Sequence, residues 1–169
     1  MTQTNLSAMT SPVLLQLRDY WLALRGTRAM PARPDIDPVH IPALLPHVIL
    51  VDVLGAPPAF RYRLIGTGVT EMANRDATGR VLDESLYGAN TDRMLAAYRD
   101  VVADGVPVAV REIVQFVPKD WIRTEVLLMP LSADGRKVDM ILGGVDTVEN
   151  ARGSWRREHH EREALDWTL

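Results

Sequence analysis

The stretch HVILVDVLGAPPAFRYRLIGTG, residues 47–68, decides the fold of this chain. It holds two apolar runs, at 48–53 and 60–65, separated by a short loop rich in glycine and proline. In the second run apolar and basic side chains alternate with a period of two, which is typical of a strand with one buried face. Two runs joined in this way predict an antiparallel hairpin.

Helical patterns precede this hairpin. Ser11 followed by Pro12 is a helix-start signal, apolar residues then recur at helical spacing, and Gly26 marks the end. The same start signal at 37–38 predicts a second, short helix that Pro46 closes.

After the hairpin, short helices are expected at about 69–74 and 83–86, and a longer amphipathic helix from Asn90 or Thr91 to Gly105. A period of two then returns, which predicts strands at 108–117, 121–131 and 138–145. This order predicts an α+β fold: a five-stranded antiparallel sheet with helices inserted after its second strand, plus an N-terminal and a C-terminal helix.

Three segments are expected along the chain. Residues 1–46 form an N-terminal helical extension, 47–149 hold the sheet with its inserted helices, and 150–169 form a charged helix. Opposite charges four residues apart, such as Arg157 and Glu161, support the last of these.

Composition excludes several classes of function. The 169 residues carry a net charge of -3, so a general basic footprint for nucleic acid is missing. The chain has no cysteine, which rules out disulfides, thiolate metal sites and a cysteine nucleophile. No apolar stretch reaches the ~20 residues that span a bilayer, and no basic segment opens a secretory signal. We therefore expect a cytoplasmic protein without a membrane span.

Several local motifs resemble the PAS superfamily of sensory modules. They are TGRVLD at 78–83, the helix end at 98–107, the hairpin at 131–136 and DTVE at 146–149. A closer likeness, from about residue 13 to 149, is to short stand-alone bacterial PAS proteins. It rests on the segments 20–21, 24–26, 30–33, 35–38, 41–42 and 61–67.

The resemblance implies a single-domain sensory or signalling module that binds a small molecule, a protein partner or both. No kinase, cyclase or DNA-binding segment follows Glu149, so output in trans is expected. A separate histidine kinase or another regulator is the implied recipient, and a homodimer is the implied assembly.

In PAS domains a pocket lies between the inner sheet face and the inserted helices, so the resemblance also implies a pocket here. The pocket candidates are Tyr62, Arg63, Met72, Tyr98, Trp121, Glu125, Met129 and Met140. The same side chains could instead fill a solid core.

The alternating strand adds a charge to this pocket hypothesis. Alternation places Phe60, Tyr62 and Leu64 on one face and the two arginines of the strand on the other. Arg61 and Arg63 could protect a sheet edge from aggregation, or one could turn inward and clamp an anionic ligand such as a carboxylate.

The first helix has an apolar face that fits two roles. It could cap its own sheet, or it could form a dimer surface, because tryptophan and tyrosine are common interface anchors. The residues of this face are Leu14, Leu17, Tyr20, Trp21 and Leu24.

Cofactor and metal signals are weak. No histidine lies between His47 and His159, which argues against haem held in the core, and the photochemical flavin subtype needs a cysteine. A flavin held without a covalent bond remains open. His159, His160 and Glu163 sit in a charged tail and are too few for a zinc site. The glycines of GTGVTE fit a turn better than a dinucleotide loop.

Two alternative functions remain at this stage. No catalytic motif is present, so no catalytic residue is predicted, but a small enzyme could combine a carboxylate with an arginine in one pocket, with Glu125 and Arg63 as candidates. A structural adaptor with a filled core is the other alternative.

Overall fold

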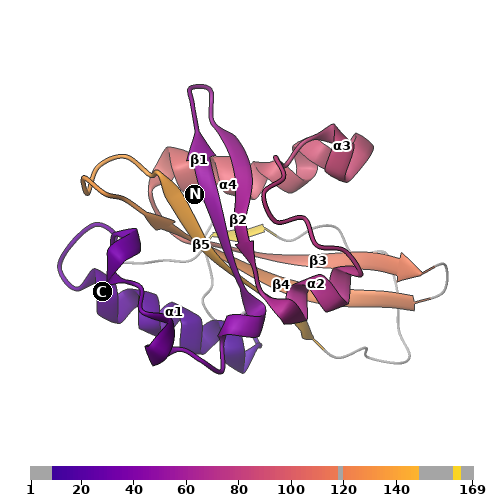
Figure 1. The fold of residues 1–169 in the computed structure, drawn as a ribbon, viewed down its shortest axis with the longest axis horizontal. Coiled ribbons are helices and arrows are strands. Elements are labelled where there is room, and N and C mark those ends of the chain that lie inside the picture. Colours follow the sequence, from indigo (N-terminus) through magenta and orange to yellow (C-terminus); the bar gives the residue numbers. More distant parts are fainter. Residues whose placement is uncertain (1–8, 118–119, 149–161, 165–169) are drawn as a thin grey trace.

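One antiparallel sheet organises the molecule (Figure 1). The computed structural model describes residues 9–117, 120–148 and 162–164, and for 112–117, 120–122 and 162–164 it describes the backbone only. The strands pair in the order β2-β1-β5-β4-β3-β6. Their bounds are β1 Val48–Leu54, β2 Ala59–Ile65, β3 Val108–Val117, β4 Asp120–Leu131, β5 Met140–Val148 and β6 Arg162–Ala164.

The first five strands confirm the expected five-stranded antiparallel sheet. The sixth strand was not expected. β6 pairs antiparallel with β3, from Val108 opposite Ala164 to Val110 opposite Arg162. The prediction of one continuous helix over 150–169 is therefore wrong at Arg162–Ala164, where the free edge of β3 offers backbone partners that the local charge pattern does not reveal. The rest of that segment lies outside the described residues.

The first helix, α1 (Pro12–Arg25), is confirmed with its start and end signals. The Ser11 side chain accepts a hydrogen bond from the Leu14 amide at 3.2 Å, and Gly26 follows the helix with φ +56°. The helix-start signal at 37–38 is confirmed, because Asp37 caps a helical turn that begins at Pro38, but the prediction that one helix runs on to Pro46 is wrong. Single 3-10 turns occupy Pro38–His40 and Leu45–His47 instead, because prolines along this segment cannot sustain a helical hydrogen-bond ladder.

The inserted helices are α2 (Thr67–Ala73), α3 (Glu84–Tyr87) and α4 (Thr91–Asp104), close to the expected positions. Gly66 begins α2 where the chain passes the backbone carbonyls of Leu45 and Pro46, which a Cβ at this position would hit. The glycine-rich segment is thus a tight turn into a helix, and every pairing in the sheet is antiparallel, so no dinucleotide-binding unit forms.

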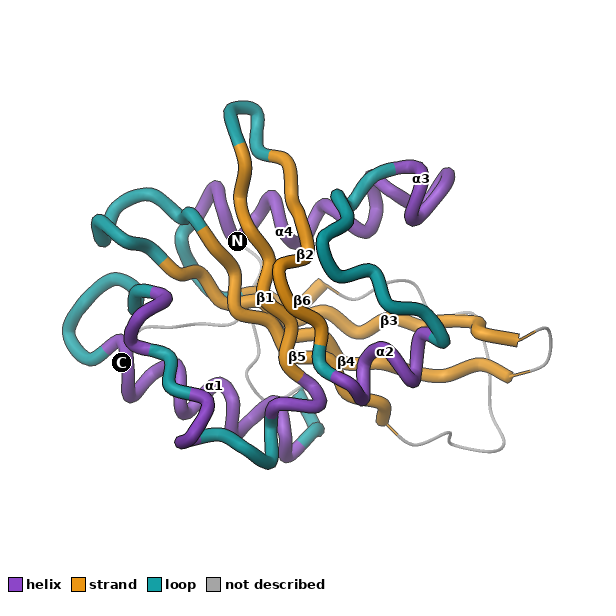
Figure 2. The backbone as a smooth tube through the Cα atoms, in the orientation of Figure 1, coloured by secondary structure: helices purple, strands orange, loops and turns teal. Residues whose placement is uncertain are grey.

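The connection between α2 and α3 runs beside β2 (Figure 2). Its backbone pairs with the strand: the Tyr62 amide donates to Arg80 at 3.0 Å, and the Leu82 amide donates to Phe60 at 2.9 Å. The outer edge of β2 is therefore covered in the described structure, and charges on this strand are not needed to protect it.

The two faces of the sheet can be assigned from two neighbouring glycines of β5. A Cβ on Gly143 would meet Ile49 and Leu128, whereas a Cβ on Gly144 would meet Leu14 and Leu17 of α1. Since side chains alternate along a strand, residues in step with Gly144 face α1 and those in step with Gly143 face α2–α4. We call these the outer and the inner face.

The outer face takes up the apolar side of α1. Leu14, Leu17 and Trp21 have no exposed surface, and the Trp21 indole donates to the Pro130 carbonyl at 3.0 Å. These three side chains are buried within the protomer because glycine at 144 lets the helix approach closely, so the prediction that they form a dimer surface is wrong. The side chains of Tyr20 and Leu24 are half-buried and pack against the same core.

Candidate ligand-binding site

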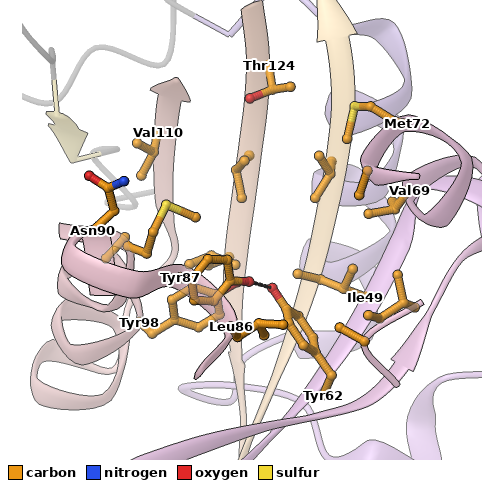
Figure 3. Close-up of a pocket in the computed structure, with 18 of the residues that line it drawn as sticks. Ile49, Tyr62, Val69, Met72, Leu86, Tyr87, Asn90, Tyr98, Val110 and Thr124 are labelled. Atoms are coloured by element: carbon orange, nitrogen blue, oxygen red, sulfur yellow. Dashed lines mark hydrogen bonds between the residues drawn. The ribbon is translucent and has the colours of Figure 1, made fainter. Parts of the chain in front are cut away.

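A cavity of about 520 Å³ lies between the inner face and helices α2–α4 (Figure 3). All five long strands contribute to its wall, with Thr124 and Val126 from β4 and Val145 from β5. From the helices come Met72 of α2 and Tyr98 of α4. This volume falls in the range of about 300–1,000 Å³ that small-molecule sites occupy.

Tyrosine hydroxyls supply polar groups inside this cavity. The hydroxyls of Tyr62 and Tyr87 lie 2.6 Å apart and are hydrogen-bonded (Figure 3). Tyr98 lines the same wall, and its ring centroid lies 5.4 Å from that of Phe60. Burial raises the pKa of Tyr62 well above its ordinary value, an effect that Tyr98 reinforces and the hydrogen bond to Tyr87 opposes. Tyr62 is therefore neutral near pH 7 and can donate as well as accept a hydrogen bond.

The mouth of the cavity is polar. Three lining residues are exposed, and they are Arg75, Asn90 and Arg93. Arg75 follows Asn74, whose left-handed conformation (φ 48°) ends α2. The Arg75 guanidinium donates to the Leu86 carbonyl at 3.2 Å, which holds it beside the segment that leads into α4.

The structure brings three of the predicted pocket residues together. Tyr62, Met72 and Tyr98 line the cavity, and whether they bind a ligand stays a prediction. Trp121 lies on β4, but its side chain is outside the part of the chain that the structure describes. The remaining candidates, Arg63, Glu125, Met129 and Met140, do not line this cavity.

Side-chain alternation and strand pairing explain why Glu125, Met129 and Met140 do not line the cavity. Glu125 opposes Asp146 and Met129 opposes Leu142, so both residues are in step with Gly144 on the outer face. Met140 opposes Asp52 of β1 and belongs to the same face. The expectation that they face the pocket was wrong because the sequence pattern of an apolar strand does not reveal which face is inward.

A β-bulge changes the alternation of β2 after Tyr62, while Arg63 stays on the face of Arg61. The pairing of β1 with β2 shifts between Leu50, which opposes Leu64, and Val51, which opposes Tyr62. The extra residue puts Leu64 on the opposite face from Tyr62, contrary to the expected alternation, and leaves Leu64 42% exposed. Arg63 itself donates to Asp52 at 2.7 Å and clamps no ligand in the cavity.

Asp52 gathers both arginines of β2. Arg61 donates to its second carboxylate oxygen at 2.9 and 3.1 Å, and Arg63 occupies the first. Burial raises the pKa of Asp52, but the hydrogen bonds from Arg63 and Arg61 outweigh it and hold the pKa below its ordinary value. Asp52, Arg61 and Arg63 therefore form an ion-pair cluster on the outer face.

Glu125 holds the start of α1. Its side chain is buried, with 1% exposed, and accepts hydrogen bonds from the Thr10 amide, the Thr10 hydroxyl and the Ser11 amide at 2.7–3.0 Å. Arg111 adds an ion pair at 3.0 Å. Burial raises the pKa of Glu125, yet the bonds from Ser11, Thr10 and Arg111 together lower it. The structure does not bring Glu125 and Arg63 together in the cavity, because each side chain is engaged in a different ion pair.

Asp146 completes this attachment of α1. The Ser11 hydroxyl donates to the Asp146 carboxylate at 2.6 Å, and the His47 ring nitrogen lies 3.4 Å from the other carboxylate oxygen. We call Glu125 and Asp146 the carboxylate clamp. Each of its members is one residue away from a side chain of the cavity wall, since Thr124, Val126 and Val145 point to the other face.

Sequence reasoning missed all three residues of the polar mouth and the threonine of the wall. Arg75, Asn90 and Arg93 lie outside regular strands or at a helix start, where no periodicity assigns a face. Alternation could not have selected Thr124, because Thr124 and Glu125 are each in step with buried apolar residues of β4.

The cavity lining bears on two cofactors that PAS domains are known to hold. No histidine is among the described lining residues, and His47 lies with Asp146 of the outer face, so haem through a core histidine does not fit. A cysteine-linked flavin does not fit a chain with no cysteine. A flavin held without a covalent bond remains a prediction.

Within residues 9–117, 120–148 and 162–164, no group of three or more histidine, aspartate or glutamate side chains is placed to hold a metal ion. His159 and His160 lie outside these ranges. No helix in the described segments is both long and apolar enough to cross a membrane.

A profile described as PAS domain matches residues 9–146. The chain therefore belongs to the PAS domain family, whose members are common sensory and signalling modules. No curated protein matches it.

Among solved structures, the chain is similar to the LOV protein of Rhodobacter sphaeroides, with 16% identity and a TM-score of 0.49 over 63% of this chain and 61% of that one. The chain thus spans about three fifths of the LOV protein's length. It is also similar to the PAS domain from Bordetella pertussis BvgS, with 15% identity and a TM-score of 0.53 over 67% of this chain and 84% of that one. At this identity the second likeness shows a shared fold.

Proposed function

We propose that this protein is a sensory module that holds a small molecule in the inner-face cavity and signals its occupancy to a separate protein. The observation that carries the proposal is the cavity of about 520 Å³, with a hydrogen-bonded tyrosine pair, in a domain of a sensory family. An adaptor with a filled core would have no cavity of this size between its sheet and its inserted helices.

The proposed route of the signal crosses the sheet. A ligand presses on Thr124, Val126 and Val145, whose neighbours in the chain form the carboxylate clamp on the start of α1. A ligand can shift only an equilibrium between states that bind it with different affinity. The two states proposed here are α1 attached by Glu125 and Asp146, and α1 with that attachment weakened.

The proposed recipient is a histidine kinase or another regulator that acts in trans. It would bind a surface that differs between the attached and the weakened state of α1. PAS domains often dimerise, and a homodimer is part of the proposal. The buried side of α1 cannot supply that contact, so it would involve surface other than Leu14, Leu17 and Trp21.

Native mass spectrometry of the protein as purified tests the proposal. We expect a mass excess under gentle conditions that disappears on denaturation, and the same spectrum counts the subunits. Ala97→Phe fills the cavity from α4 and should abolish the excess. Ala96→Phe is the matched control, because Ala96 is the neighbour of Ala97 on the same helix and does not line the cavity. A bare mass for the wild type, with no small molecule taken up from a metabolite mixture, would contradict the proposal.

A further inference from the structure

A single helical turn forms part of the cavity wall. α3 holds only the four residues Glu84–Tyr87, and the Asp83 side chain caps its start. Two of its side chains line the cavity: Leu86, which is buried, and Tyr87, which is half-buried. One turn of helix is not stable by itself, so the position of α3 depends on its contacts with the rest of the molecule.

Two hydrogen bonds hold α3 from opposite sides. The Tyr87 hydroxyl is bonded at 2.6 Å to the hydroxyl of Tyr62 on β2, within the cavity (Figure 3). On the exposed side, the Arg75 guanidinium donates to the Leu86 carbonyl at 3.2 Å. The tyrosine pair therefore joins α3 to the sheet across the cavity, and the arginine joins it to the end of α2.

The mouth of the cavity borders α3. Arg75 contacts α3 from the end of α2, and Asn90 and Arg93 lie just beyond α3 at the start of α4. These three exposed lining residues thus come from the two segments that flank α3 in the chain. An outward movement of α3 would withdraw Leu86 and Tyr87 from the wall and widen the mouth.

Gly88 ends α3 in a conformation that side chains other than glycine rarely adopt. Its φ is +56°, and no described atom lies within 4 Å of the position that a Cβ would take. Gly88→Ala therefore strains the backbone of this ending without a clash. Gly135 in the β4–β5 connection has the same two properties, with φ +74° and open space around a Cβ. The two glycines form a matched pair for an experiment.

We propose that α3 is the gate of the cavity. It moves outward to admit and release a small molecule, and the hydrogen bond between Tyr62 and Tyr87 is the latch that holds it closed. This inference rests on the proposed function and adds the route by which the ligand is exchanged. A variant that weakens an interaction made only in the closed state shifts the equilibrium toward the open state.

The lack of cysteine in the chain permits a direct test by thiol labelling. Ala97→Cys places one thiol on the α4 side of the cavity wall, where Ala97 is 7% exposed. Ala109→Cys places one at a buried position of the outer face and is the reference for global unfolding. The reagent is methyl methanethiosulfonate, which is small and neutral, and mass spectrometry follows its addition to each intact variant.

We expect the Ala97→Cys variant to be labelled much faster than the Ala109→Cys variant and with a weaker dependence on urea, because local opening exposes less surface than unfolding. Tyr87→Phe in the Ala97→Cys background should raise the labelling rate about fivefold, the factor that one ordinary hydrogen bond represents. Gly88→Ala should raise it by about fivefold or more. Tyr20→Phe and Gly135→Ala are the controls and should leave the rate unchanged.

Three results would overturn the gate. The first is fast labelling of the Ala97→Cys variant that neither Tyr87→Phe nor Gly88→Ala changes, because the cavity would then be open without movement of α3. The second is equal labelling of the two thiols with equal urea dependence, which would leave global unfolding as the route. The third is an equal acceleration by Gly135→Ala. Each can occur with or without a mass excess in the native spectrum, so failure of the gate is distinguishable from failure of the proposed function.

Discussion

The two faces of the sheet are built on different principles. On the outer face, α1 buries Leu14, Leu17 and Trp21 completely and is held at its start by Glu125 and Asp146. On the inner face, α2 has no fully buried side chain, and a cavity separates part of the helical layer from the strands. The outer face is packed, whereas the inner face combines a packed part under α4 with a cavity.

This difference teaches where stability and response are located. A packed face with charged hydrogen bonds has one favoured arrangement, and changes within it are costly. A hollow face can adopt more than one packing at small cost, which is what a ligand site requires. Because neighbouring residues of one strand serve both faces, a change in the hollow side can reach the fixed side.

Truncation of Trp21 should give the largest effect. Trp21→Ala removes a fully buried ring and its hydrogen bond to Pro130, so we expect a loss of about 3–5 kcal/mol in the free energy of unfolding. Met72→Ala on the inner face should cost less than about 1 kcal/mol, because that half-buried side chain already borders a void. Urea denaturation measures both, and equal losses would remove the contrast between the faces.

Loss of the carboxylate clamp should have the next largest effect. Glu125→Ala leaves the amides of Thr10 and Ser11 and the Arg111 guanidinium without their acceptor, and we expect a loss of about 2–3 kcal/mol. Proteolysis should then cut within residues 9–25 before it cuts the sheet. Asp139→Ala in the β4–β5 connection removes another carboxylate and is the control. An equally early cut within residues 9–25 of this control variant would count against the carboxylate clamp.

The same residue predicts a pH dependence. The pKa of Glu125 is lower in the folded chain than its ordinary value of about 4.3, so the unfolded chain binds more protons between the two values. The stability that Glu125 contributes is fully present above the pKa of its carboxyl in the unfolded chain. It is lost as the pH falls through the lower pKa of the folded chain. Glu125→Gln should flatten this acid limb in denaturation curves, and an unchanged slope would contradict the assignment.

Removal of one tyrosine hydroxyl should have a small effect on stability. Tyr62→Phe deletes a hydrogen bond to Tyr87, and we expect a loss of about 1 kcal/mol in the free energy of unfolding. The variant should lose affinity for ligands that place a polar atom beside the tyrosine pair in the cavity. Tyr20→Phe, whose hydroxyl bonds to Asp37 beside α1, is the matched control. Equal ligand affinity in both variants would show that the inner hydroxyl pair does not contact the ligand.

Much of the fold could be predicted from local signals. Ser11 and Gly26 set the limits of α1, and the alternation around Tyr62 identified β2 and placed Phe60 and Tyr62 on one face. These signals succeed because capping and side-chain alternation depend on neighbours in the chain.

What the sequence could not show depends on residues distant in the chain. The bulge that moves Leu64 away from the face of Tyr62 is set by pairing with β1, and β6 forms by pairing with β3. The inward side of β4 is chosen by the packing of α1 against Gly144. Because that choice was unknown, Glu125 was assigned to the pocket and its neighbour Thr124 was missed.

Amide hydrogen exchange of the two helical layers is the most direct test of the contrast between the faces. We expect amides in the middle of α1 to exchange at rates set by global unfolding, and those of α2 and α3 to exchange much faster through local opening. Addition of a cavity ligand should slow exchange in α2 and α3 first. Protection of α2 and α3 equal to that of α1 in the ligand-free protein would contradict a hollow, responsive inner face.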